Sequence, residues 1–430
     1  MPPHGVLADN DFGVELLSKG KATEAVRRLE AAVATAPNFV LARYNLACAR
    51  ARAGDLDGAR SDLEQVFESD LIGMRAHAEV DPDLVELWKS ALGLALRAKL
   101  PDLEARYESV LRRGLHAILW QEGTSHRGGA IRPFLVRVGV YDIETARFLP
   151  VAPFSPSAFM GFASTRAPVA VVATGDVRET LGGDLDPGKV IDKVQFFPFS
   201  TRGVATTVLA LKLEAYGATL ELGSSGARLE ACQVVPIDGD PGSSNYCAMF
   251  DVASDGAVTK KLAAPRPHAP PIPSLDRPVV IDLGYSHWGY VVTEADAAFT
   301  FRPYELTLPS GAKIAVPKEA AFYQASPRAI VASPAGDRIV LVFNATVLNC
   351  MPSSAVPGRY KLTLVEPGTG KVAVLGEGDG AGHATFRADG ELFVQQGKRV
   401  YHVARDGALD TLPEGVLLVP PLDRDDNCGP

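Results

Sequence analysis

Apolar side chains recur every three to four positions up to about residue 113, and mostly at every second position beyond it. The first spacing is typical of amphipathic helices and the second of half-buried strands. Short runs divided by Gly, Pro, Asp and Ser follow Gly114, as in all-β domains. The pattern predicts a multidomain α plus all-β chain: a helical part over 1–114, a β part over 115–422 and an acidic tail over 423–430.

The helical part contains an internal repeat. Three residues return after 34 positions: Gly20, Ala25 and Leu29 as Gly54, Ala59 and Leu63. Glycine supplies the left-handed conformation at a helix turn. The small alanines let two antiparallel helices approach closely. Because one helix pair cannot bury its apolar face alone, the pairs are expected to stack on one another.

The segment Phe12–Pro37 resembles the tetratricopeptide signature, and the 34-residue period is that of the same family. The second unit departs at its end, where Val66 and Leu71 replace a small residue and a proline. Asp81 and Pro82 then predict the cap and first turn of a further helix. That end of the array is similar to the terminal units of bacterial tetratricopeptide proteins. A generic bundle of helical hairpins is the alternative.

The resemblance implies that the inner face of the first helices binds a peptide or a partner protein. The residues expected on that face are Asn10, Val14, Tyr44, Asn45, Cys48 and Arg52. Tyr44 and Arg52 are expected to be exposed there, since packing does not require them. Asn45 matches one position of the clamp with which some family members hold a carboxylate, but no lysine accompanies it. The alternative is that this face packs against the rest of the chain.

One phrase, a strand followed by a polar turn and a second strand, recurs through the β part. Its copies are 138–151, 218–229, 247–262, 304–316, 360–375 and 400–412. A second phrase, a polar turn leading into a strand, occurs at 332–342 and 387–394, and resembles the blades of TolB-type and WD-type propellers. In the first of these, Ile339, Leu341 and Phe343 alternate onto one face.

The resemblance implies a β-propeller of five to seven blades. The segments 182–190 and 263–278 are then insertions, the second a proline-rich connector or a docking segment for an aromatic groove. The alternative architecture is a pair of β-sandwiches divided at this connector.

Few residues indicate a catalytic, metal-binding or cofactor-binding site. The chain has five cysteines and eight histidines, without the paired spacings of a zinc site, and no nucleotide-binding or hydrolase motif. We therefore expect no enzyme, metal or cofactor. Tyr285, His287, Trp288 and Tyr290 form an aromatic cluster suited to an interface or ligand, or to packing. Disulfides Cys232–Cys247 and Cys350–Cys428 are expected only in an oxidising compartment.

The 430 residues carry a net charge of −8 and no basic patch, which argues against nucleic acid as a partner. The start lacks the pattern of a signal peptide, and no segment is apolar enough to span a membrane. We expect a soluble cytoplasmic protein, or a periplasmic or secreted one if a leader precedes this sequence. The leading hypothesis is a noncatalytic scaffold that binds protein or peptide partners. The alternatives are a propeller enzyme or ligand-binding protein with a site in a central funnel, and a TolB-like envelope protein.

Overall fold

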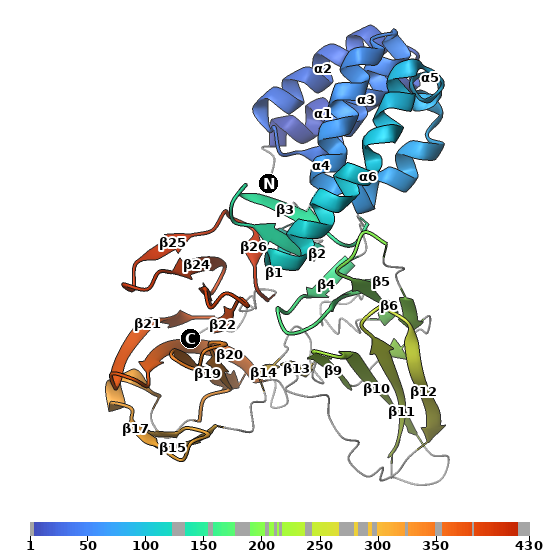
Figure 1. The fold of residues 1–430 in the computed structure, drawn as a ribbon. Coiled ribbons are helices and arrows are strands. Elements are labelled where there is room, and N and C mark those ends of the chain that lie inside the picture. Colours follow the sequence, from blue (N-terminus) through green and yellow to red (C-terminus); the bar gives the residue numbers. More distant parts are fainter. Residues whose placement is uncertain are drawn as a thin grey trace. The chain divides into compact units, whose positions relative to one another are not determined.

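The chain forms two compact units (Figure 1). The helical unit comprises Met1–Gly114, Val140–Phe154 and Ser200–Arg202; the β unit comprises Leu115–Gly139, Ser155–Phe199 and Gly203–Pro430. The computed structural model describes residues 4–122, 134–153, 158–176, 190–202, 206–209, 213–214, 217–236, 243–265, 279–282, 291–294, 299–322, 326–348, 355–380 and 382–419.

Consecutive helices of the helical unit pack against one another as an array. Its helices are α1 (His4–Ser18), α2 (Ala22–Thr35), α3 (Val40–Ala53), α4 (Leu56–Val80), the 3₁₀ turn η1 (Pro82–Leu84), α5 (Val85–Lys89) and α6 (Ala91–Arg113). Gly20 (φ 76°) and Gly54 (φ 87°) adopt the predicted left-handed conformation at the two helix turns. Ala25 and Leu29 of α2 are fully buried. The predicted helical array is therefore confirmed.

The second helix pair does not end where the first one does. Its helix α4 runs for 25 residues to Val80, with one non-helical residue, Asp70, whose carboxylate accepts from the Gly73 N–H at 3.0 Å. Asp81 then caps η1 by accepting from the Asp83 N–H at 2.9 Å, and Pro82 lies in its first turn, as predicted. Val66 and Leu71 fill the core where the first unit has its proline turn, so this helix continues.

Helix α6 binds the later segments of the helical unit. The Tyr107 hydroxyl donates to the Pro150 carbonyl at 2.7 Å. The Glu108 carboxylate accepts from the Thr201 N–H at 2.8 Å, and Arg113 pairs with Glu144 at 2.9 Å. The helical unit therefore includes two segments that follow Gly114 in the sequence.

The β unit consists of short, almost wholly antiparallel strands. Two sheets follow chain order: β4 (Ala158–Phe162), β5 (Val169–Asp176), β6 (Val190–Pro198) and β7 (Thr206–Leu209), with β8 (Leu213–Glu214) beside β6; and β22 (Gly382–Phe386), β23 (Leu392–Gln396), β24 (Arg399–Val403) and β25 (Leu409–Thr411). A three-stranded sheet contains β15 (Thr300–Arg302), β16 (Glu305–Thr307) and β17 (Lys313–Ala315).

The largest sheet has ten strands in the order β12-β11-β10-β9-β13-β14-β18-β19-β20-β21. They are β9 (Gly217–Gly223), β10 (Gly226–Pro236), β11 (Ser243–Ala253), β12 (Val258–Pro265), β13 (Val279–Asp282), β14 (Val291–Glu294), β18 (Ala329–Ala332), β19 (Ile339–Leu348), β20 (Ala355–Glu366) and β21 (Lys371–Asp379). Leu222 of β9 pairs with Val279 of β13. Strands from both sides of the 263–278 connector thus share one sheet.

All six copies of the recurring sequence phrase form hairpins: β2–β3, β9–β10, β11–β12, β16–β17, β20–β21 and β24–β25. Here β2 is Phe134–Asp142 and β3, part of the helical unit, is Arg147–Pro150. One turn recurs at 253–257, 308–312, 387–391 and 404–408. In each copy the fourth residue is a glycine with φ between 83° and 91°, whose N–H donates to the carbonyl of the first residue at 2.9–3.0 Å. This is the three-residue hairpin loop with a left-handed glycine.

Both faces of β19 are buried over Ile339–Phe343. Ile339, Leu341 and Phe343 share one core cluster, as the alternation predicted, while Val340 and Val342 belong to another. A strand covered on both faces reads as a continuous apolar run, which is what the sequence shows here.

The first and last strands of the β unit pair with each other. Strand β26 (Val416–Leu417) is antiparallel to β1 (Leu115–Glu122), with Ile118 opposite Leu417. The Trp120 N–H adds a hydrogen bond to the Gly415 carbonyl at 2.8 Å. No helix in the described part of the chain has both the length and the apolar character needed to cross a membrane.

Candidate functional site

The repeat predicts an inner face formed by α1 and α3, and the side chains of these two helices contact each other. The Asn45 side-chain amide of α3 donates to the Asn10 side-chain carbonyl of α1 at 2.8 Å. Asn10 is only 4% exposed, so its amide is positioned between the two helices. This bond joins the two repeat units directly.

Tyr44 does not lie open on this face, and the expectation that it does is wrong. Its side chain is 3% exposed, and its hydroxyl donates to the Asp81 carboxylate at 2.6 Å. The Cys48 thiol lies 3.7 Å from the same oxygen. Burial, and then the charge of Asp81, raise the pKa of the Cys48 thiol, which is therefore a poor nucleophile. Asp81 follows directly after α4, which continues to Val80, and so it reaches the Tyr44 hydroxyl of α3.

Arg52 is exposed, as expected, but is held by an ion pair. Its guanidinium lies 2.9 Å from the carboxylate of Asp83, in η1. Arg52 and Tyr44 thus both contact the segment that caps the array. A role for Arg52 in partner binding stays a prediction.

An exposed apolar strip remains beside the asparagine pair. Val14, one turn after Asn10 in α1, is 40% exposed, and Leu41, one turn before Asn45 in α3, is 41% exposed. Residues four apart lie on one face of a helix, so Val14 flanks Asn10 on α1 and Leu41 flanks Asn45 on α3. We call Val14, Leu41 and Asn45 together the α1/α3 strip. The helical spacing from Asn45 would have been enough to identify Leu41.

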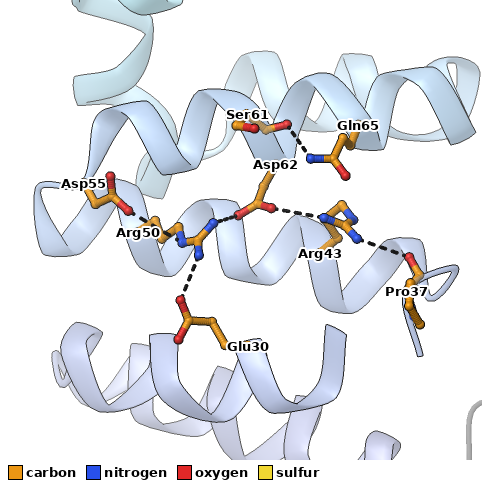
Figure 2. Close-up of polar contacts among 8 residues, drawn as sticks. All are labelled: Glu30, Pro37, Arg43, Arg50, Asp55, Ser61, Asp62 and Gln65. Carbon is orange, nitrogen blue, oxygen red and sulfur yellow. Dashed lines mark hydrogen bonds and ion pairs between the residues drawn. The ribbon is translucent and has the colours of Figure 1, made fainter. Parts of the chain in front are cut away.

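A buried ion-pair network fixes α3 between its neighbours (Figure 2). Asp62 of α4 lies 2.6 Å from the Arg50 guanidinium and 3.3 Å from that of Arg43, both on α3. Arg50 also pairs with Glu30 of α2 at 2.8 Å. Burial raises the pKa of Asp62, although both guanidinium charges act in the opposite direction. The network thus links α3 to both α2 and α4.

A second polar site lies in the β unit, where three segments meet. The ring of His116, in β1, stacks on Phe199 with centroids 3.7 Å apart. Its Nδ1 lies 2.6 Å from the Ser164 carbonyl. A carbonyl oxygen only accepts, so Nδ1 carries the proton. Burial lowers the pKa of His116 to about 4. The ring is therefore neutral at pH 7.

Ser164 begins a tight turn that contacts strand β22. The Ser164 hydroxyl accepts from the Arg166 N–H at 3.2 Å, and its carbonyl from the Ala167 N–H at 3.1 Å. The Thr165 hydroxyl lies 2.7 Å from the Thr385 hydroxyl and donates to the Phe386 carbonyl at 3.3 Å. Thr385 is therefore the donor of the hydroxyl pair.

His383 lies two residues before Thr385 in β22 and so points to the same side of the strand. Burial, followed by the charge of Arg166, lowers the pKa of His383 to about 4. The Asn344 side chain fixes the start of this strand by accepting from the Gly382 N–H at 3.0 Å. We call the set His116, Ser164, Thr165, Arg166, His383 and Thr385 the junction cluster. Sequence reasoning missed it, because no motif links these residues.

Several predicted positions lie outside the described residues. They are Tyr285, His287, Trp288, Tyr290, Cys350 and Cys428. Cys232 of β10 is directly opposite Cys247 of β11 in the backbone register, as expected for strands of one hairpin. Within the described ranges, no three His, Cys, Asp or Glu residues are arranged to hold a metal ion.

Comparison with known protein families and with curated proteins gave no match. Among solved structures, the β-propeller domain of the Trilobed protease from Pyrococcus furiosus is 14% identical, with a TM-score of 0.29, over 70% of this chain and 82% of that domain. The acylaminoacyl peptidase of Pyrococcus horikoshii is 14% identical, with a TM-score of 0.26, over 69% of this chain and 46% of the peptidase. The chain thus spans about half of that peptidase. Similarities of this size carry no argument about function.

Proposed function

We propose that this chain is a noncatalytic interaction protein whose helical unit is a short tetratricopeptide-type array that binds a peptide or protein partner on the α1/α3 strip. The observation that carries the proposal is the exposure of Val14 and Leu41 beside the bonded Asn10–Asn45 pair. Apolar side chains supply contact area, while an amide positioned in advance supplies directed hydrogen bonds at low entropic cost.

We further propose that the β unit is a propeller of five to seven blades and serves as the second part of the scaffold. Support comes from the four-stranded antiparallel sheet β22–β25 and from the pairing of β26 with β1. Pairing between the first and last strands closes a ring of blades, which removes exposed strand edges. The ten-stranded sheet is the feature that a pair of sandwiches would accommodate more simply.

The strip is tested with peptides selected from a random display library on the full chain. Leu41→Asp should weaken the selected peptides at least tenfold, since it places a charge in the apolar contact. Leu94→Asp is the matched control, because Leu94 is an exposed leucine of α6, away from the strip. Equal loss with both variants, or no loss with Leu41→Asp, would refute binding on this strip.

A second candidate function is ligand binding at the junction cluster. It is favoured by the convergence of two histidines and an arginine from segments that are distant in the sequence. Side chains from several elements that meet at one place are typical of small-molecule sites. This function is compatible with an interaction role for the helical unit.

A further inference from the structure

We infer that the junction cluster binds an oxyanion, either a phosphate or a carboxylate, through His383 and Arg166. This inference rests on the second candidate function proposed above, and names the chemical class of its ligand. The geometry of the three segments carries it.

His383 is the central residue of the proposed site. It is half-buried, as are Thr165, Arg166 and Thr385. Among the residues that the structure describes, none forms a hydrogen bond with the His383 ring. By contrast, the His116 ring of the same cluster donates to the Ser164 carbonyl. A half-buried imidazole that lacks partners is suited to bind a ligand from solution.

The surroundings of His383 are fixed before any ligand arrives. Asn344 holds the backbone of Gly382 on one side, and the Thr165–Thr385 pair holds the strand on the other. The turn that carries Arg166 is closed by the two hydrogen bonds to Ser164. Side chains on a rigid frame lose little entropy when a ligand binds.

The chemistry of the cluster favours an anion. None of its six residues carries a carboxylate, whereas the Arg166 guanidinium and the His383 imidazole supply donors. An Arg guanidinium has five N–H donors, so it can bind an oxyanion in addition to a protein partner. The positive charge near His383 disfavours a ligand cation. An anion beside the ring would instead favour its protonated form.

The test is an NMR titration of the full chain labelled with ¹³C-histidine. His383 is assigned with His383→Gln, and its pKa is measured in chloride, inorganic phosphate and acetate at equal ionic strength. We expect phosphate or acetate to raise the pKa of His383 saturably by about one unit or more, and the responding anion identifies the class. His402, which contacts Glu391 in another part of the unit, is the internal control. Equal shifts at both histidines would mean screening by salt and overturn the inference.

Two variants separate a wrong ligand class from the absence of a site. Arg166→Gln should abolish the response, and Thr385→Val should weaken it if Arg166→Gln fails to fold. A panel of neutral amides and sugars is titrated in parallel. If neutral compounds shift the His383 signals and anions do not, the cluster is a binding site and the oxyanion assignment is wrong. If neither group does, the second candidate function falls as well.

Discussion

Gln395 and Val419 are joined by two hydrogen bonds, as two residues of neighbouring strands would be. The Gln395 side chain donates to the Val419 carbonyl at 3.0 Å and accepts from the Val419 N–H at 3.0 Å. It also accepts from the Leu418 N–H at 2.8 Å and is fully buried. One side chain therefore satisfies the backbone that follows β26, and holds the last strand of the β unit in place.

Gln395→Leu should lower the free energy of unfolding of the β unit by about 3 kcal/mol, because it leaves several buried backbone groups without partners. Gln396→Leu is the control, since the Gln396 side chain makes one bond, to the Leu375 carbonyl. The measurement is urea unfolding followed by tryptophan fluorescence, to which Trp120 of β1 contributes. Equal stability of the two variants would show that the Gln395 bonds do not hold β26.

Asp62→Ala should cost the helical unit about 2–3 kcal/mol, because Arg43 and Arg50 would lose the buried partner that they share, while Arg50 would keep its pair with Glu30. Glu30→Ala removes the exposed end of the same network and should cost at most about 1 kcal/mol. Thermal unfolding followed at 222 nm compares them. A small loss for Asp62→Ala would mean that the network is solvated.

Tyr44→Phe should lower stability and leave peptide affinity unchanged, whereas Leu41→Asp should lower peptide affinity and leave stability almost unchanged. Removal of the Tyr44 hydroxyl leaves the Asp81 oxygen without its short bond, so stability should fall by about 1–2 kcal/mol while peptide affinity stays unchanged. Leu41→Asp should lower affinity and leave stability within about 0.5 kcal/mol, since the side chain is exposed. If Tyr44→Phe lowered the affinity for the peptide, Tyr44 would be part of the binding face.

The free energy of unfolding should decrease in acid because His116 is neutral in the folded protein. Its folded pKa, about 4, lies below that of an unfolded histidine. The unfolded chain therefore takes up the proton first, and stability present above about pH 6.5 is lost as the pH falls towards 4, by up to about 3 kcal/mol. Urea unfolding at pH 7 and 4.5 compares the wild type with His116→Gln. The variant should lose less between the two pH values; equal losses would contradict a neutral buried ring.

Cys232 and Cys247 should form a disulfide when the protein is oxidised, because their backbone positions are directly opposite in the β10–β11 pair. The bond would stabilise the β unit by on the order of 3 kcal/mol. Peptide mapping by mass spectrometry after mild oxidation checks the pairing, with Cys247→Ser as control. Mapping that finds only reduced Cys232 would disprove the pairing.

Cys48 should resist thiol reagents in the folded protein, since it is buried and its pKa is raised.

Much of the local structure could be predicted from the sequence. The 34-residue spacing placed left-handed glycines at Gly20 and Gly54, and the alternation at Ile339–Phe343 identified a strand. The recurring phrases all proved to be hairpins. These features depend on hydrogen bonds and steric limits between residues close in the chain, so the residues involved are adjacent in the sequence as well.

The candidate sites were decided by the tertiary structure. Asp81 covers Tyr44 from 37 positions away, and Thr165 meets Thr385 across 220 positions. An amphipathic pattern says that a face will be buried, but not which element buries it, because burial of apolar surface is non-directional. The sequence by itself determined the helices, hairpins and turns. Only packing between distant segments decided which polar side chains became supports and which stayed open to a partner or ligand.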